Sequence, residues 1–259
     1  NDFSSKMNVE NKILELRKSL HRHNHLYYML DNPEISDFQF DQMLKELEEL
    51  EKAHPEFQDS NSPTQRVGSS LNNDFISIQH NYPMYSLENS YSKEELLKWK
   101  ERIVKILKTE NISFSCELKL DGVSISLSYQ NGNLVRGLTR GDGQKGDDVT
   151  KNIRTINTIP LKTLKKIDYD FDIRGEVVIE KTDFEQLNKL RLKNGEEPYM
   201  NPRNTASGSI KLVSSKEVRK RPLKCYFFQI ISENSPFKSQ SESLNIAKEL
   251  GFNISKTNK

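Results

Sequence analysis

At the centre of the chain runs Cys116-Glu117-Leu118-Lys119-Leu120-Asp121-Gly122. Charged and apolar residues alternate along this run, as they do in a β-strand that buries one face. The side chains of Glu117, Lys119 and Asp121 then share one face, and the leucines take the other. We therefore expect an extended strand here, with its apolar face packed on a core.

The chemistry of this run has two interpretations. A lysine held between two carboxylates is suited to act as a nucleophilic amine close to a metal ion and a phosphate. The same alternation is equally typical of an edge strand that carries a solvated ladder of opposite charges. The run by itself leaves both open, so the rest of the sequence has to decide between them.

Two helices are expected before this run. Apolar residues recur every three or four positions between residues 9 and 31, and Asp31-Asn32-Pro33 ends that pattern. A second helix starts at Ser36, where Gln39 completes a capping box. Two helices with a short connection predict an antiparallel hairpin. We place this helical hairpin in a first domain of residues 1–73.

Strand patterns dominate the second domain, residues 74–259, after one more helix at about residues 92–107. Asn131-Gly132 separates two strand patterns and is a strong hairpin signal. Thr182 and Glu185 suggest a capping box at the start of a later helix. The remaining elements are expected at about 123–129, 134–140, 169–179 and 223–231 (strands) and at about 182–192 and 244–250 (helices). The predicted class is α+β with mainly antiparallel sheets.

Composition excludes several classes of protein. The 259 residues are 34% hydrophobic and 29% charged, with a net charge of +2, which is typical of a soluble globular protein. No apolar run is long enough to span a membrane, and the N-terminus lacks a signal-peptide core. Two cysteines are too few for a disulfide framework or a cysteine zinc site. We expect a reduced, cytoplasmic protein without membrane contact.

Charge is unevenly distributed along the chain. Residues 31–59 hold ten acidic residues against two lysines, whereas residues 200–225 hold seven basic residues against one glutamate. The second group, called the basic cluster below, is a candidate surface for the phosphate backbone of nucleic acid. A solvated basic face is the plainer alternative.

A glycine-rich run needs separate treatment. Gly141-Asp142-Gly143-Gln144-Lys145-Gly146 fits the dinucleotide-binding glycine pattern. That fingerprint opens a parallel βαβ unit, whereas this run follows a tight antiparallel hairpin. We interpret it as a turn that directs Arg140 inward.

Asp37 and Asp41 lie four residues apart on the second predicted helix, and Tyr27 and Tyr28 end the first. Across a hairpin these four side chains could lie close together. Two carboxylates and two rings would suit a flat cationic ring such as a nicotinamide. The plainer alternative is that Asp37 only complements the N-terminus of its helix.

Taken together, these residues resemble the NAD-dependent DNA ligases of bacteria. Lys119-Leu120-Asp121-Gly122 is similar to the lysine-x-aspartate-glycine signature of covalent nucleotidyltransferases, which ATP ligases, RNA ligases and capping enzymes share. The segments Tyr27-Tyr28, Pro33-Glu34-Ile35-Ser36-Asp37 and Phe40-Asp41 are similar to the family's nicotinamide-mononucleotide-binding helices. Further family motifs occur in order at Ser62-Pro63-Thr64-Gln65-Arg66-Val67-Gly68, Pro83-Met84-Tyr85-Ser86-Leu87-Glu88-Asn89, Thr139-Arg140-Gly141-Asp142-Gly143, Arg174-Gly175-Glu176 and Asn201-Pro202-Arg203-Asn204.

The resemblance implies roles for matched residues. Lys119 would carry AMP, and Asp121 would belong to the same catalytic motif. Arg140 and Glu176 would contact the ribose or phosphate region. The nicotinamide mononucleotide half of NAD would be bound by Tyr27, Tyr28, Asp37, Phe38, Gln39, Phe40 and Asp41, the adenosine half by Ser86, Leu87 and Glu117, and DNA by Arg203 and Lys211.

Three matched positions depart from the family's pattern. Tyr28 stands where some members have histidine. Phe40 stands where many members have tyrosine, which keeps the ring but removes a hydroxyl group. Lys211 stands where others carry arginine, which keeps the charge but loses bidentate phosphate geometry.

The implied reaction starts with attack of Lys119 on the α-phosphorus of NAD, which is a substrate, and releases nicotinamide mononucleotide. AMP then passes to the 5′-phosphate of nicked double-stranded DNA, and the 3′-hydroxyl seals the nick, in replication and repair. A lysine amine is almost fully protonated near pH 7, and adjacent carboxylates stabilise that form. We therefore expect Mg²⁺ to offset them.

The resemblance also implies how much of the enzyme is present. The family's later lysine motifs and its zinc finger are expected after Lys259. We therefore expect a nucleotidyltransferase domain truncated at its C-terminal end, zinc only in the missing part, and a fragment incomplete for nick sealing. The protein is expected to be a monomer in the bacterial cytoplasm, working at the nucleoid.

Two other functions remain to be weighed. An ATP-dependent ligase or capping enzyme would share the lysine motif but would not need residues 1–73. A non-catalytic nucleic-acid-binding module would use the basic cluster. It would bind DNA in a salt-sensitive way without forming covalent AMP.

Overall fold

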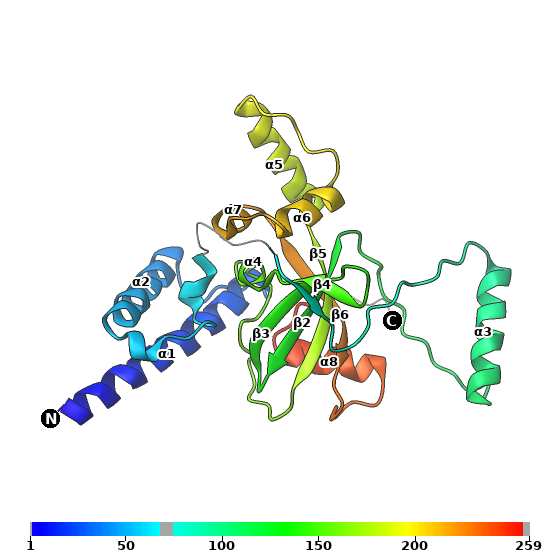
Figure 1. Cartoon of the computed structure of the whole chain (residues 1–259), viewed down its shortest axis with the longest axis horizontal. Coiled ribbons are helices and arrows are strands. Elements are labelled where there is room, and N and C mark those ends of the chain that lie inside the picture. Colours follow the sequence, from blue (N-terminus) through cyan, green and yellow to red (C-terminus); the bar gives the residue numbers. More distant parts are fainter. Residues whose placement is uncertain (1, 68–74, 256–259) are drawn as a thin grey trace.

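The computed structural model describes residues 2–67 and 75–255, with the side chains of residues 6–66 and 75–255. A helical hairpin lies beside a domain built on a central sheet, and α3 (Lys93–Leu107) stands apart from both (Figure 1). The predicted α+β class with antiparallel sheets is confirmed. None of the helices in the described ranges is long and apolar enough to span a bilayer.

The hairpin consists of α1 (Asp2–Tyr28) and α2 (Asp37–Ala53), followed by the short 3-10 helices η1 (Pro55–Phe57) and η2 (Pro63–Val67). The capping box predicted at Ser36 is confirmed, because its side chain accepts from the Gln39 backbone N–H and the Gln39 side chain accepts from the Ser36 N–H. The stripe of apolar residues predicted along the two helices forms a small core around Ile13, Leu20 and Leu47.

The central sheet has four antiparallel strands in the order β3-β2-β5-β6. The strands are β2 (Val123–Gln130), β3 (Asn133–Thr139), β5 (Phe171–Val178) and β6 (Lys224–Ile231). The short strands β1 (Ser77–Gln79) and β4 (Lys145–Asp147) pair with each other. The hairpin predicted at Asn131-Gly132 is confirmed, because these residues have φ angles of 47° and 79°, as a two-residue type I′ turn requires.

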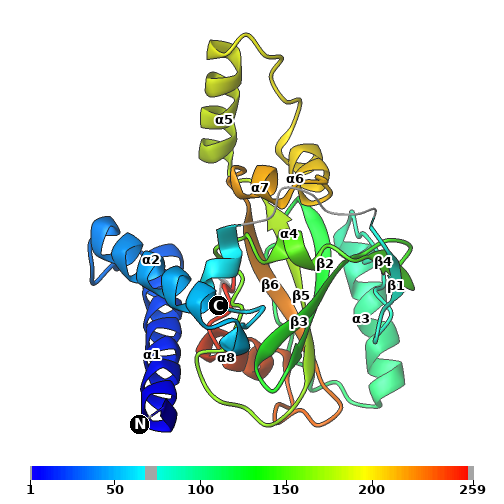
Figure 2. The ribbon, with the colours of Figure 1, turned by 60° about the vertical axis from the view of Figure 1, so that its left-hand side comes forward.

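The two faces of the sheet differ in chemistry. One face packs in the main core, where Ile125, Ile173 and Phe227 are buried. The other face carries polar side chains in register, with Ser124 opposite Glu176 and Glu176 opposite Tyr226. Figure 2 shows how the helices gather around the sheet, with α5 projecting from one end; they are α4 (Thr150–Ile153), α5 (Lys181–Lys193), α6 (Pro202–Ile210), α7 (Ser215–Arg219) and α8 (Gln240–Glu249).

The strand predicted through residues 114–121 is wrong. No helix or strand lies between α3 and β2, and the side chains of Phe114 and Leu118 are 46% and 59% exposed. Alternation defines the faces that an extended chain would have, but a strand also needs a neighbouring backbone to pair with. None of the described strands pairs with this stretch, which we call the nucleophile segment (residues 111–121).

The capping box predicted at Thr182 is also wrong, because α5 begins one residue earlier, at Lys181. Glu180 holds the N-cap position and makes no side-chain capping bond. Its carboxylate instead accepts hydrogen bonds from Lys224 and Tyr226 on β6. Contacts across the sheet have therefore overridden a local sequence signal.

The hairpin is held against the sheet domain by buried polar contacts. The Arg66 guanidinium donates to the carbonyl oxygens of Ile156 at 2.8 Å and Ile159 at 2.9 Å. Asn24 donates to the Asn157 carbonyl at 3.1 Å. Burial, and then the charge of Arg219, lower the pKa of Arg66 to about 10. The domain boundary predicted between residues 73 and 74, like Gly68 of the family motif, lies outside the described residues.

Candidate functional site

The most ordered part of the candidate site is built around Glu176 on β5. Its Oε1 accepts from the backbone N–H of Gly122 at 3.1 Å, and its Oε2 accepts from the Ser124 hydroxyl at 2.7 Å. A Cβ on Gly122 would lie 2.1 Å from the Val177 carbonyl oxygen, so only glycine allows this approach. Gly122, the last residue of the lysine motif, is therefore fixed to the sheet. The sequence analysis did not identify Ser124.

Arg140 is positioned by the turn that follows β3. The Arg140 N–H donates to the Ser124 carbonyl at 3.2 Å, and its guanidinium donates to the Ser86 hydroxyl. Gly141 and Gly143 have φ angles of 58° and 89°, a left-handed region that glycine adopts readily. The Asp142 carboxylate accepts from two backbone N–H groups of the same turn, first that of Lys145, and these bonds keep its pKa below the usual range. The turn thus places Arg140 beside Ser86.

Arg174, another residue whose role the sequence analysis missed, anchors the approach to Ser86. Its side chain is buried, and its guanidinium donates to the carbonyl oxygens of Tyr82 at 3.0 Å and Pro83 at 2.6 Å. Burial lowers the pKa of this arginine. Charged residues at alternate positions of this strand, Asp172, Arg174 and Glu176, were the signal that could have indicated a polar anchor. Leu87, which follows Ser86, is 74% exposed.

The nucleophile segment is held differently. Glu117 Oε1 accepts from the Ser115 hydroxyl at 2.8 Å and from Gln240 Nε2 at 3.0 Å. Asp121 forms an exposed ion pair with Arg203 at 3.3 Å. Lys119 is exposed and has no ion-pair or hydrogen-bond partner among the described residues. The two carboxylates are thus engaged by residues from outside the run, and no salt-bridge ladder forms along it.

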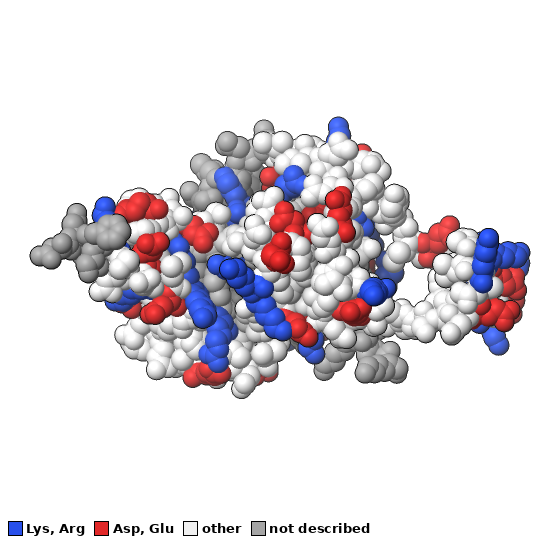
Figure 3. Space-filling model, turned by 90° about the horizontal axis from the view of Figure 1, so that it is seen from below, with Lys and Arg blue, Asp and Glu red and all other residues white. Residues whose placement is uncertain are grey.

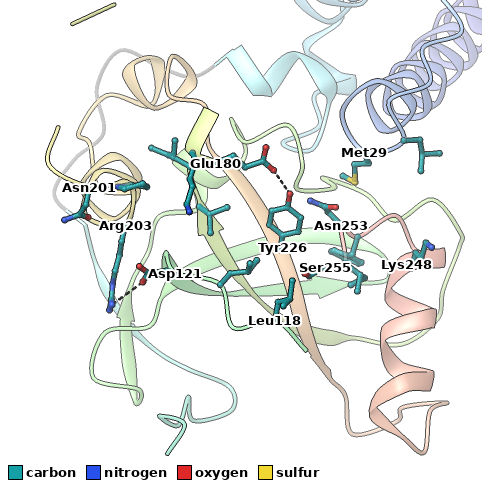
Figure 4. A pocket seen from close by; sticks show the side chains of 18 of the residues that line it. Met29, Leu118, Asp121, Glu180, Asn201, Arg203, Tyr226, Lys248, Asn253 and Ser255 are labelled. Atoms are coloured by element: carbon teal, nitrogen blue, oxygen red, sulfur yellow. Dashed lines mark hydrogen bonds and ion pairs between the residues drawn. The ribbon is translucent and has the colours of Figure 1, made fainter. Parts of the chain in front are cut away.

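An open cavity of about 1270 Å³ lies beside this segment (Figure 4). Leu118, Leu120 and Asp121 all line it, so the prediction that Asp121 lies on the opposite face from the leucines is wrong. Without a strand ladder, nothing keeps alternate side chains on opposite faces. Met29 at the end of α1 and Tyr226 on β6 also line the cavity.

Glu180 and β6 form a polar wall of this cavity. The Tyr226 hydroxyl donates to Glu180 Oε1 at 2.5 Å, and Lys224 donates to Glu180 Oε2 at 2.7 Å. The bonds from Lys224 and then Tyr226 keep the pKa of Glu180 below its usual value. Burial, followed by the Glu180 carboxylate, raises the pKa of Tyr226 to about 12. The wall therefore presents a neutral phenol beside an ionised carboxylate.

The residues predicted to bind nicotinamide mononucleotide lie at the end of the hairpin where α1 connects to α2. The rings of Tyr27 and Tyr28 meet edge to face at 4.7 Å, and both are more than two-fifths exposed. Burial is the main cause of the raised pKa of Tyr28, and the negative charge of Asp37 adds a small contribution. Asp41 is exposed on α2.

The intervening residues of α2 have different environments. Phe38 is 69% exposed. Phe40 packs against the hairpin core, and the Gln39 side chain closes the capping box. Phe40 and Gln39 therefore already have structural roles, whereas Phe38 and the two aspartates are open to solvent.

Part of the basic cluster is paired with neighbouring carboxylates. Four of its seven bases form ion pairs, among them Lys224 with Glu180. Lys211 pairs with Asp147 at 2.6 Å, Arg203 with Asp121, and Lys220 with Glu217. On the lower face, drawn in Figure 3, cationic and anionic side chains are interspersed. A DNA phosphate at Arg203 or Lys211 would have to replace an existing ion pair.

The metal-ligating side chains of the described residues do not form a metal-binding site. Within residues 2–67 and 75–255, no group of three or more His, Cys, Asp or Glu side chains is arranged to hold a metal ion. These residues therefore do not fit a divalent ion bound by the protein alone.

Two family patterns match the sequence. Residues 72–259 match the NAD-dependent DNA ligase adenylation domain, and residues 6–68 match the DNA ligase-like, N-terminal NAD+-binding domain. A protein named DNA ligase from Flavobacterium johnsoniae is 53% identical over 248 residues, which are 96% of this chain and 37% of that protein. One of the same name from Bacteroides fragilis is 47% identical over 251 residues, again 96% and 37% of the two chains. The chain thus spans 37% of the length of these relatives.

Proposed function

Because the chain belongs to the NAD-dependent DNA ligase family, we propose that it is the region of such a ligase that takes AMP from NAD onto Lys119. The single observation that carries this proposal is the hydrogen bond from the Gly122 N–H, three residues after Lys119, to the Glu176 carboxylate. This contact gives the nucleophile segment a defined end on the sheet domain. The ordered placement of Arg140 and Ser86 nearby supports the same function.

In the proposed reaction, Nζ of Lys119 forms a bond to the α-phosphorus of NAD. The bond from that phosphorus to the bridging oxygen breaks, and nicotinamide mononucleotide leaves with the electron pair. The ammonium group of Lys119 first loses a proton to water, which frees the lone pair for attack, and the nitrogen loses a second proton once it is bonded to phosphorus. Water can accept both protons because Lys119 is exposed. Arg140, held by Ser86, would stabilise the phosphate charge that develops in the transition state.

The hairpin would bind the leaving half of NAD. Tyr27, Tyr28, Asp37 and Asp41 would surround the cationic nicotinamide ring, with Phe38, Gln39 and Phe40 on the same helix, whereas Glu117 and Leu87 would contact the adenosine half. Binding energy gained far from the reacting bond can orient the α-phosphorus for in-line attack. Substitution of Asp41 by alanine in the full-length protein should therefore abolish adenylylation from NAD and spare sealing of pre-adenylylated DNA. An equal loss in both assays would contradict this division of roles.

The later steps and surroundings are part of the proposal. AMP would pass to the 5′-phosphate of nicked DNA, with Arg203 and Lys211 on the DNA side, in replication and repair in the bacterial cytoplasm. The enzyme would act as a monomer. Mg²⁺, if required, would be held by phosphate oxygens and water, as is usual for this ion, because the described residues form no cage for it. Zinc remains a prediction for sequence beyond Lys259.

Intact-mass spectrometry of the full-length protein after incubation with NAD tests the proposal. One AMP adduct should form with NAD but not with ATP, and Lys119→Ala should abolish it. An adduct from ATP alone would favour the ATP-dependent alternative. Salt-sensitive DNA binding without any adduct would favour the non-catalytic module. We also expect the isolated chain to acquire AMP slowly, and an adduct at the rate of the full-length protein would contradict this.

A further inference from the structure

Gln240 connects three separate parts of the molecule. It is the first residue of α8, and its side-chain nitrogen donates to Glu117 Oε1 at 3.0 Å and to the Phe228 carbonyl at 2.7 Å. The amide thus joins α8, β6 and the nucleophile segment. Because that segment pairs with none of the described strands, this contact replaces the ladder that would otherwise hold it.

The base of the Gln240 side chain is fixed by its own helix. Ser239 caps α8 by accepting from the Glu242 N–H, and the Ser243 hydroxyl donates to the Gln240 carbonyl at 2.7 Å. Leu244 and Ala247 anchor the same helix, because both are buried. The amide therefore reaches Glu117 from a rigid support.

The contact leaves one oxygen of Glu117 unused. Gln240 and Ser115 both donate to Oε1, whereas Oε2 has no hydrogen-bond partner in the described part of the chain. Glu117 lies two residues before Lys119, and Gly122, three residues after it, is held by Glu176. The lysine therefore lies between two fixed points, and Gln240 supplies the first.

We propose that Gln240 is a positioning residue for AMP transfer, which holds the Glu117 carboxylate so that Oε2 accepts a hydrogen bond from the exocyclic amine of the adenine. This inference rests on the proposed function and adds Gln240 as the residue that orients the Glu117 carboxylate toward the adenine. A dinucleotide with a carbonyl group in place of that amine, such as nicotinamide hypoxanthine dinucleotide, cannot donate to Oε2. The contact therefore predicts selectivity as well as rate.

The experiment compares Gln240→Ala, Gln240→Glu and the control Asn245→Ala in the full-length protein. Asn245 is an exposed amide on the same helix. Formation of the AMP adduct is followed against the concentration of each dinucleotide, which gives KM, the maximal rate and the preference for NAD over the hypoxanthine analogue. Thermal unfolding of each variant is recorded in parallel.

We expect Gln240→Ala to raise KM for NAD on the order of tenfold, as for loss of one hydrogen bond to a charged acceptor. Its maximal rate should fall less, and its preference for NAD over the analogue should drop. Gln240→Glu should be worse, because a second carboxylate cannot donate and repels Glu117. Asn245→Ala should match the wild type in all three quantities.

Two results would overturn the inference. One is a Gln240→Ala protein with wild-type KM and wild-type preference for NAD. The other is a variant that loses thermal stability and maximal rate while both of those quantities stay unchanged, which indicates a purely structural role. A wild-type protein that never takes AMP from NAD would instead refute the proposed function itself, so the two failures are distinguishable.

Discussion

The chain is held on both sides of Lys119, at Glu117 before it and at Gly122 after it, but by different kinds of contact. Gly122 is fixed by a carboxylate from β5 and fits so closely against that strand that no side chain is allowed. Glu117 lies on an exposed chain and is held through the side chains of Ser115 and Gln240. Gly122 is therefore fixed as part of the folded sheet domain. Glu117 instead depends on two side-chain hydrogen bonds, each of which a single substitution can remove.

The difference between Gly122 and Glu117 shows that rigidity at the site comes from contact with the sheet and not from the charge pattern around Lys119. Charged and apolar residues alternate evenly from Glu117 to Asp121, so the sequence does not distinguish the two sides of Lys119. Only on the side joined to β2 does a backbone group of the described chain, the Gly122 N–H, bond to the sheet. Side-chain hydrogen bonds at exposed positions contribute little to stability. Changes at the Gly122 end should therefore affect folding and transfer together, and changes at the Glu117 end should affect transfer alone.

The largest effect is expected for Gly122→Ala. The added methyl group would meet the Val177 carbonyl oxygen at 2.1 Å, so the chain after Lys119 must move. A displacement of about 1 Å can cost roughly a hundredfold in rate. Adduct formation should fall by at least that factor, and the melting temperature should fall as well.

The matched control is Gly208→Ala on α6, where a Cβ meets nothing within 4 Å. It should leave the rate unchanged and raise stability slightly, because alanine favours a helix over glycine by up to about 1 kcal/mol. If Gly122→Ala and Gly208→Ala had the same rate of adduct formation and the same melting temperature, the idea that the Gly122 side is rigidly held would be wrong.

A smaller effect is expected for Glu176→Gln. The amide keeps one acceptor but presents a donor to either the Gly122 N–H or the Ser124 hydroxyl. Because the hydroxyl can turn to accept, the loss should be about one charge-assisted hydrogen bond, or roughly tenfold in adduct formation. Glu185→Gln, an exposed glutamate on α5, is the control and should match the wild type.

Tyr226→Phe should change stability rather than transfer. It removes a hydrogen bond to Glu180, a partly exposed group, so the loss at pH 7 should be below about 1 kcal/mol. The pKa of Glu180 is lowered in the folded protein, so this stabilisation is present above the usual glutamate pKa and disappears as the pH falls through the lowered value. Thermal melts should therefore differ at pH 7 and converge in acid, and a difference that grows in acid would contradict this.

The smallest effect is expected for Ser115→Ala at the exposed end. One of two donors to Glu117 Oε1 is lost, while Gln240 still holds the carboxylate. KM for NAD should rise by about twofold without a change in melting temperature, as for a solvated hydrogen bond. A loss as large as that of Glu176→Gln would show that both ends are equally constrained.

Local signals predicted much of the fold. The cap at Ser36 and the turn at Asn131-Gly132 depend on residues within a few positions of each other, so the sequence was sufficient for both. The lysine motif and its order relative to other motifs indicated the family, which the comparisons support. The assignment of individual site residues remains a prediction.

Other features depend on partners far along the chain. The strand expected at residues 114–121 did not form, because alternation does not say which backbone lies beside it. Ser124 and Gln240 belong to no motif, and the motif that contains Arg174 does not indicate what its side chain contacts. Each of the three residues matters through a residue more than 50 positions away. The start of α5 was misplaced for the same reason, since Glu180 is used by β6.

The sequence by itself determined the helices of the N-terminal hairpin, the turn at Asn131-Gly132 and the chemical identity of the lysine motif, because these depend on short-range backbone geometry and on which side chains are present. Only the tertiary structure decided which side of Lys119 is rigidly held, which oxygen of Glu117 stays unpaired, and which bases of the basic cluster form ion pairs. Those properties come from close approach between distant segments, and distance in space is not encoded in any local pattern.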